Sequence, residues 1–175
     1  ELDGKKTTWY ASGKKESEET YIEDGIRDWG DYGDGIWTSW YENGEKQSEG
    51  SYGIEMDGKK TTWYASGKKE SEGTKKVGKA ERGHKIWIDD GIWTSWYEDG
   101  QKKSEGFYKD DVKDSIWTSW YEDGQKKSET SFKDGKKMAL TQWYENGQKK
   151  AEEFFQDRKK DWVWKPKGIW TYWAP

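Results

Sequence analysis

The most regular feature of the chain is an aromatic pair followed by a glycine turn and an alternating polar run. The unit reads Trp-Tyr-Glu-Asn/Asp-Gly-Gln-Lys-Lys-Ser-Glu and is often preceded by Gly-Ile-Trp-Thr-Ser. Alternation of aromatic and polar positions around a glycine turn predicts β-hairpins. No stretch spaces apolar residues as a helix does over three turns, so we expect no helix. The pairs are Trp9-Tyr10, Trp40-Tyr41, Trp63-Tyr64, Trp96-Tyr97, Trp120-Tyr121 and Trp143-Tyr144.

The spacing of these pairs defines an internal repeat. Successive Trp anchors, ending with Trp173 in a broken seventh copy, lie 31, 23, 33, 24, 23 and 30 residues apart. The basic period is therefore 23, with insertions at about 19–33, 74–89 and 155–167. We predict one domain over residues 1–175, built from about six and a half units that contact mainly their neighbours.

The turn sequences predict how each hairpin closes. Both central residues of a type I′ turn have positive φ, which Asn, Asp and Gly tolerate. We therefore expect type I′ turns at Asn43-Gly44, Asp99-Gly100, Asp123-Gly124 and Asn146-Gly147. Copies one and three have Ser12-Gly13 and Ser66-Gly67, where a three-residue loop with a glycine bulge is equally possible.

A two-residue turn would also fix which side chains face each other. A ring opposite a glycine would cover an otherwise bare backbone, and both faces of the sheet would carry rings. Lysines opposite tyrosines, such as Lys46 and Lys102, would lie over those rings. The expected pairs are Tyr41 with Lys46, Trp40 with Gln47, Trp37 with Gly50 and Trp93 with Gly106.

Two architectures fit stacked hairpins with rings on both faces. One is an elongated single-layer antiparallel sheet, and the other rolls so that one ring ladder becomes a thin core. Polar runs such as residues 101–105 leave too little apolar area for a closed two-sheet core. We therefore predict an all-β, elongated single-layer sheet of thirteen or fourteen strands.

Composition removes several functional classes. Ile, Val, Leu and Phe make up only 18 residues and charged residues 38%, but 15 Trp and 11 Tyr argue against a disordered chain. A net charge of −4 argues against nucleic acid as the partner. There is no cysteine and no run of 18 apolar residues, so we expect neither thiol chemistry nor a membrane span. The compartment stays open.

Catalytic and metal chemistry finds little support. The single histidine, His84, lies in a basic insertion and is expected to be solvated. Acidic turns such as Asp89-Asp90 and Asp110-Asp111 lack the ligand spacing of a calcium loop. Catalytic residues are singular, whereas one glutamate recurs in every unit, so we expect a scaffold without catalytic residues, metal or cofactor. The recurring glutamates are Glu18, Glu49, Glu72, Glu105, Glu129 and Glu152.

The signature Gly-x-Trp-x-x-Trp-Tyr-x-x-Gly-x-x-x-x-Glu-x-x-Tyr resembles the MORN-repeat variant family, the type found in YwqK-like bacterial proteins. The clearest matches are residues 91–108, 123–132 and 143–154. The resemblance implies stacked β-hairpins and no catalysis, and the antitoxin label of YwqK-like members implies a protein partner. A weaker likeness is to the choline-binding repeats of cell-wall proteins, which also place Trp-Tyr before a glycine turn.

The aromatic ladder is the first candidate site. Its rings could replace the missing aliphatic core, stack against sugar faces of a polysaccharide, or form a groove for a protein partner. The ladder comprises Trp9, Trp37, Trp40, Tyr41, Trp63, Trp93, Trp96, Tyr97, Trp117, Trp120, Tyr121, Trp143, Tyr144, Trp170 and Trp173.

Two charged insertions of opposite sign are the second candidate site. They could pair within one chain or between chains, or remain solvated loops. The acidic insertion carries Glu19, Glu23, Asp24, Asp28, Asp31 and Asp34, and the basic one carries Lys75, Lys76, Lys79, Arg82 and Lys85.

The broken copy at residues 168–173 lacks a second strand and would present an edge, which invites another strand. Trp170 and Trp173 could instead cap the array. We expect a non-enzymatic scaffold that binds a protein partner or assembles head to tail with its own copies, through this edge and the first hairpin. Polysaccharide or cell-wall binding by the rings is the alternative.

Overall fold

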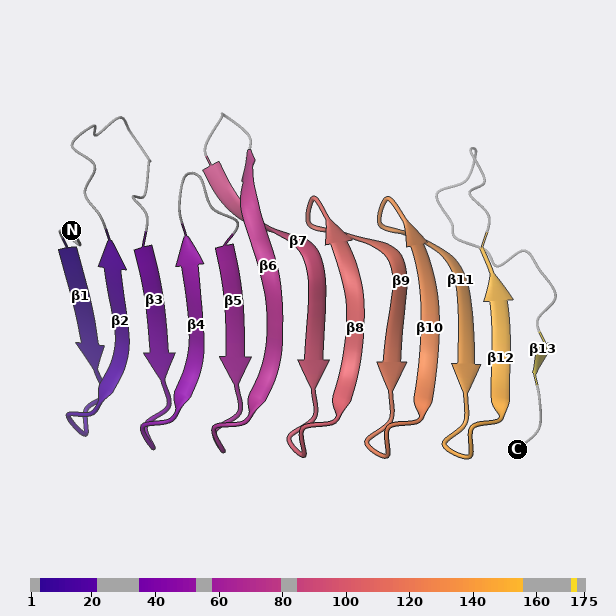
Figure 1. The fold of residues 1–175 in the computed structure, drawn as a ribbon, viewed down its shortest axis with the longest axis horizontal. Coiled ribbons are helices and arrows are strands. Elements are labelled where there is room, and N and C mark those ends of the chain that lie inside the picture. The colour runs from indigo at the N-terminus through magenta and orange to yellow at the C-terminus, as the bar shows by residue number, and fades with distance from the viewer. Residues whose placement is uncertain (1–3, 22–34, 53–57, 80–84, 156–170, 173–175) are drawn as a thin grey trace.

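The fold is a single antiparallel sheet with its strands in chain order (Figure 1). The computed structural model describes residues 4–21, 35–52, 58–79, 85–155 and 171–172, and all their regular structure is β-strand. The predicted elongated single-layer all-β sheet is confirmed. Its thirteen strands are β1 (Gly4–Trp9), β2 (Lys15–Tyr21), β3 (Gly35–Trp40), β4 (Lys46–Tyr52), β5 (Gly58–Trp63), β6 (Lys69–Lys79), β7 (Lys85–Trp96), β8 (Lys102–Lys109), β9 (Val112–Trp120), β10 (Lys126–Lys133), β11 (Lys136–Trp143), β12 (Lys149–Phe154) and β13 (Thr171–Tyr172).

Six similar loops close the hairpins at one end of the sheet. In the second, the Gly44 N–H donates to the Tyr41 carbonyl and the Tyr41 N–H donates to the Glu45 carbonyl, both at 2.8 Å. Gly44 has a φ of +96°, whereas Asn43 is not among the described residues with positive φ. This is a three-residue loop with a glycine bulge. The type I′ prediction for the Asn-Gly and Asp-Gly copies is wrong, and the alternative given for copies one and three forms in all six.

The bulge changes the cross-strand register beside each loop. Trp40 lies opposite Lys46, and the register shifts between Ser39 and Trp40. The predicted pairs of Trp40 with Gln47 and Tyr41 with Lys46 are therefore wrong. One residue further the ladder returns to the predicted register, because Gln47 of β4 has no partner on β3 and takes up the one-residue offset.

Type I′ geometry does occur, at the opposite end of the sheet. Asp110 and Asp111, which join β8 to β9, have φ values of 52° and 67°. Asp134 and Gly135, which join β10 to β11, have φ values of 49° and 75°. Two consecutive residues with positive φ match the type I′ requirement. The tight two-residue turns thus connect one repeat to the next.

The basic insertion is part of the sheet. Its described residues extend β6 and β7 into the longest hairpin, in which Val77 lies opposite Trp87. Most of the acidic insertion, at residues 22–34, and of the third insertion, at residues 156–170, lies outside the described residues.

The sheet has no enclosed interior. No large side chain of the described residues is fully buried, and the only buried apolar one is Ala151, at 1% exposed. Stability must therefore come from rings, lysine stems and backbone pairing on two open faces. The described residues contain no helix with the length and apolar character that crossing a membrane requires.

Candidate functional site

One face of the sheet carries a row of tryptophans covered by lysines, here called the lysine–tryptophan row. Each tryptophan is the first residue of a Trp-Tyr pair, and the lysine two residues after the preceding hairpin's turn glycine lies over its ring. The Nζ atoms lie 5.1 to 5.5 Å from the ring centroids, within cation–π range. Consecutive hairpins are thereby joined. The pairs are Lys15–Trp40, Lys46–Trp63, Lys69–Trp96, Lys102–Trp120 and Lys126–Trp143.

The same lysines also hold the recurring glutamates. In each hairpin the lysine after the turn pairs with the glutamate three residues on, at 2.5 to 2.8 Å. Lys69, and then Lys59 across the strand pair, hold the pKa of Glu72 below its usual range. Lys102 lowers the pKa of Glu105 in the same way. Each of these glutamates thus forms an ion pair with the lysine of its own hairpin.

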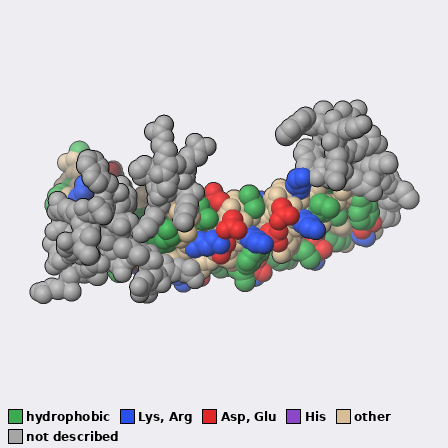
Figure 2. Space-filling model, turned by 90° about the horizontal axis from the view of Figure 1, so that it is seen from above, with side chains coloured by type: hydrophobic (Ala, Val, Ile, Leu, Met, Phe, Trp, Pro, Cys, Tyr) green, Lys and Arg blue, Asp and Glu red, His purple; other side chains and the backbone are tan. Residues whose placement is uncertain are grey.

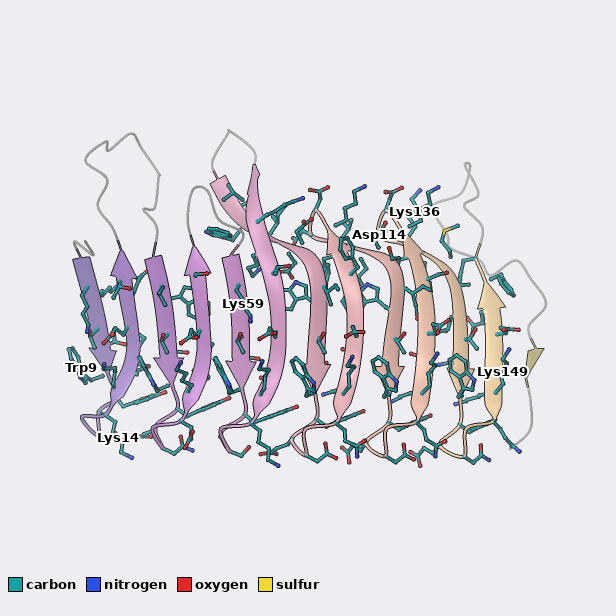
Figure 3. The ribbon with its side chains drawn as sticks, viewed as in Figure 1. Trp9, Lys14, Lys59, Asp114, Lys136 and Lys149 are labelled. Atoms are coloured by element: carbon teal, nitrogen blue, oxygen red, sulfur yellow. The ribbon has the colours of Figure 1, made fainter. Side chains whose placement is uncertain are left out.

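Trp9 stands apart in this row. It is 60% exposed, because no described strand precedes β1 to supply a covering lysine. Figure 3 shows Trp9 at the β1 end of the sheet. Trp63 has the same local sequence, since residues 4–18 recur unchanged as residues 58–72, but it is half-buried beneath Lys46.

The tyrosines of the Trp-Tyr pairs join the hairpins through hydrogen bonds. Each hydroxyl donates to the backbone carbonyl of the tryptophan in the next hairpin, at 2.6 to 2.9 Å. The repeat pattern does not predict these contacts, because nothing in it shows which carbonyl a hydroxyl reaches. The donors and acceptors are Tyr10–Trp40, Tyr41–Trp63, Tyr64–Trp96, Tyr97–Trp120 and Tyr121–Trp143.

Lysines do cover tyrosines, but these lysines are not Lys46 and Lys102, the two that the sequence predicts. Lys46 and Lys102 lie over Trp63 and Trp120, so their predicted stacking on tyrosines is wrong. Because of the bulge, the lysine one residue further along the strand lies over the tyrosine of the same hairpin. The observed pairs are Lys103–Tyr97, Lys127–Tyr121 and Lys150–Tyr144, at 5.2 to 5.5 Å.

Tryptophan rings cover backbone glycines on the face that carries the tyrosines. Trp93 lies opposite Gly106 as predicted, but its ring covers Gly73 on the preceding hairpin, and Trp117 covers Gly106. A Cβ atom at either glycine would collide with the indole. The Trp93 and Trp117 rings therefore fasten one hairpin to another, whereas Trp37 covers Gly50 within its own hairpin. The pairs of ring and glycine are Trp37–Gly50, Trp87–Gly58, Trp93–Gly73 and Trp117–Gly106.

The most enclosed ring cluster lies between β7 and β9. The Tyr108 ring packs edge-on against Trp93 at 6.2 Å and Trp117 at 4.9 Å. The Lys113 Nζ lies 4.0 Å from the Trp117 centroid. Burial raises the pKa of Tyr108 and lowers the pKa of Lys113. This cluster has no counterpart in the sequence analysis, which omitted Tyr108 and Lys113.

Two lysines of the basic insertion form ion pairs with nearby aspartates. Lys75 binds Asp89 at 2.6 Å, and Lys76 binds Asp90 at 2.8 Å and Asp110 at 2.9 Å. Lysines and aspartates alternate along the ends of the strands on this side of the sheet (Figure 2). Lys76 thus joins the long hairpin to the turn between β8 and β9, whereas Lys75 pairs within the long hairpin.

The remaining predicted site residues can be placed only in part. Glu19 lies in β2, while Lys79 and Lys85 end the long hairpin at β6 and β7. Within the described ranges no three His, Cys, Asp or Glu side chains come together as a metal site would require. Outside the described residues lie Trp170, Trp173, Glu23, Asp24, Asp28, Asp31, Asp34, Arg82 and His84.

The repeat geometry agrees with a known family. The model of the MORN repeat variant matches residues 2–23, 33–52, 89–110, 113–134 and 139–157, more than half of the chain. The chain belongs to this family. The matches leave out the hairpin of β5 and β6, which keeps the MORN repeat variant contacts, with Lys46 over Trp63 and the Tyr64 hydroxyl on the Trp96 carbonyl. No curated protein matches the chain.

Proposed function

We propose that this MORN repeat variant protein is a non-enzymatic scaffold that binds a protein partner or assembles head to tail with its own copies. The observation that carries the proposal is the open single-layer sheet, in which the described residues leave large apolar side chains exposed and pair β1 on one side only. An edge strand offers unpaired backbone groups to an incoming strand. A surface that repeats the same contacts suits a partner with matching strands or repeats.

Exposed apolar side chains beside the lysine–tryptophan row support a protein partner. Ile92, Ile116 and Phe154 are 63%, 56% and 51% exposed. Each of them lies two residues along its strand from a threonine or a glutamate, so that these side chains share one face of the sheet. Apolar side chains within a polar, charged surround are typical of protein interfaces.

The lysines favour this proposal over polysaccharide binding. Sugar stacking requires a free ring face, but five of the row's tryptophans lie beneath lysines. Trp9 is the exception, at the edge of the sheet. One exposed ring is a poor platform for a polymer but a reasonable anchor for a strand partner.

Two measurements test the proposal on the 175-residue chain. Analytical ultracentrifugation should show a mass that rises with concentration, while titration with a panel of glycans should leave the tryptophan fluorescence unchanged. A monomer at every concentration together with a saturable fluorescence shift on one glycan would replace the proposal with polysaccharide binding.

A further inference from the structure

The sheet contains one strand sequence in two settings. β1 and β5 both read Gly-Lys-Lys-Thr-Thr-Trp. β5 pairs with β4 and β6, whereas β1 pairs with β2 alone among the described residues. Trp9 is 60% exposed at the end of β1, and Trp63 is half-buried at the end of β5. Since the sequences are identical, the difference comes from the strand that precedes β5.

The pairing of β4 with β5 shows which groups of one hairpin contact the first strand of the next. Glu49 of β4 lies opposite Thr61. Lys46 places its Nζ 5.4 Å from the Trp63 centroid. The Tyr41 hydroxyl donates to the Trp63 carbonyl at 2.9 Å. An incoming strand thus meets a tyrosine, a lysine and a glutamate from one hairpin.

The β11–β12 hairpin carries the same three groups at the far end of the sheet. Lys149 pairs with Glu152 at 2.8 Å, as its counterparts do on β4. Figure 3 places Lys149 on β12 at a level along the strands similar to that of Trp9 on β1. Tyr144, Lys149 and Glu152 occupy the repeat positions of Tyr41, Lys46 and Glu49.

The edge of β12 is covered by a short strand of the same chain. Among the described residues, β13 pairs with β12 through Tyr172 opposite Ala151 and Thr171 opposite Glu152. These are the β12 positions that correspond to the ones β4 uses to hold β5. β13 therefore occupies the place of a first hairpin strand, and its two described residues form a shorter ladder than the six residues of β1 could.

We propose that β1 of one molecule displaces β13 from β12 of a second copy and pairs there in the register that β5 adopts on β4. In this register Thr7 lies opposite Glu152 and Thr8 opposite Ala151, and Lys149 covers Trp9. Lys6 meets Glu153, a cross-strand pair of opposite charge. The inference rests on the proposed self-assembly and names its two strands.

Strand exchange is preferred to direct contact between the outer edges of β13 and β1. Both are first strands of their hairpins, and in this sheet every first strand pairs only with second strands. Exchange restores that rule at the junction between molecules, whereas contact of β13 with β1 breaks it. The sequence led us to expect head-to-tail assembly between the first hairpin and the edge at residues 168–173. In the proposed exchange the first hairpin still takes part, but its β1 strand pairs with β12.

The decisive experiment weakens β13 in the full chain. Proline has no backbone N–H, so the double variant Thr171→Pro/Tyr172→Pro should release β13 from β12. A larger fraction of molecules then presents a free β12 edge, and we expect about tenfold tighter self-association by sedimentation velocity. Adding Trp9→Ala should reverse this gain about tenfold or more, because the ring and its lysine contact are lost. Trp63→Ala, the matched control inside the sheet, should leave self-association unchanged.

A second pair of variants tests the register. Lys6→Glu should weaken self-association, and mixing it with the Glu153→Lys chain should restore a complex between the two. Weaker association of the proline variant would overturn the exchange and point to the outer edge of β13, with the proposed self-assembly still standing. A monomer for every variant would overturn both.

Discussion

The tyrosine hydroxyls are the smallest features that tie one repeat to the next. Five of them donate to a tryptophan carbonyl of the following hairpin, beside the loop and its bulge. That carbonyl lies where the strand ends, so a side-chain donor replaces a missing ladder partner. Desolvation raises the pKa of Tyr97, one of these donors, so it stays protonated and keeps donating at neutral pH.

Tyr97→Phe tests this contact. Loss of the 2.8 Å bond to the Trp120 carbonyl should lower the free energy of unfolding by about 0.5–1.5 kcal/mol. The measurement is urea unfolding followed by circular dichroism. The control is Tyr108→Phe, since the Tyr108 hydroxyl makes no hydrogen bond within the described residues. Equal losses in both variants would show that packing, and not the hydrogen bond, sets the effect.

The glycine beneath a tryptophan ring is a second contact at this scale. The position of Trp117 over Gly106 is filled one hairpin later by Leu140 opposite Thr130. The chain thus combines a large ring with glycine and a smaller side chain with threonine. Neighbouring strands adjust to each other in size, as side chains on a shared face must.

Gly106→Thr should therefore destabilise the sheet by about 1–3 kcal/mol, because a Cβ atom at Gly106 collides with the Trp117 indole. The double variant Gly106→Thr/Trp117→Leu recreates the Leu140–Thr130 combination and should recover part of that loss. Urea unfolding of the four chains gives the coupling energy. Additive losses would contradict the size matching.

At the scale of the hairpin, the loops show what the sequence could and could not predict. Strand positions, single-layer order and the pair of Trp37 with Gly50 followed from alternation and the repeat period. The loop type did not, because Asn-Gly suits both a type I′ turn and a loop with Gly44 alone at positive φ. One extra loop residue then moved Lys46 from Tyr41 to Trp40 and Trp63.

The direction of the ring contacts was also beyond the sequence. Trp93 has a glycine opposite on each side, Gly73 and Gly106, and alternation cannot tell which one its ring covers. The structure decides for Gly73. Sequence patterns along one chain predict which side chains share a face, but contacts between hairpins depend on rotamers.

The lysine–glutamate pairs predict how stability depends on pH. Lysines hold the pKa values of Glu18, Glu72 and Glu105 below the usual range. A carboxylate whose folded pKa is lowered stabilises the fold above its unfolded value, and this contribution is lost as the pH falls through the folded value. The urea midpoint should therefore fall as the pH drops below about 4.3, the ordinary glutamate pKa.

Glu72→Gln should make this acid dependence shallower, because one of the titrating pairs is removed. The matched control is Glu98→Gln, since Glu98 is exposed and forms no ion pair within the described residues. Urea midpoints measured between pH 7 and pH 3 compare the two variants. An unchanged pH profile for Glu72→Gln would contradict a role for these pairs in stability.

At the scale of the whole molecule, each described strand is hydrogen-bonded in the sheet only to the strands beside it in the chain. Removal of one whole repeat unit should therefore leave a chain that still folds. Excision of residues 97–120 joins Trp96 to Tyr121, and the joined sequence keeps one complete unit. We expect the shorter chain to fold as a sheet, with a smaller denaturant slope because less surface is exposed on unfolding.

Excision of residues 97–108 is the matched control. It removes one loop and one strand, so two first hairpin strands follow each other without a second strand between them. This chain should lose much of its β signal in circular dichroism, whereas the in-phase excision keeps it. Equal loss of signal in both chains would show that particular hairpins, and not the phase of the repeat, are required.

The absence of an enclosed core among the described residues affects the heat capacity of unfolding. Since no large side chain of the described residues is fully buried, unfolding adds little apolar surface to what water already touches. Apolar hydration dominates the heat-capacity increment, which for ordinary domains is about 12–15 cal/mol/K per residue. This sheet should fall below that range in scanning calorimetry. Its curve of unfolding free energy against temperature would then be shallow. Cooling or warming would therefore lower that free energy less than in a protein with a hydrophobic core.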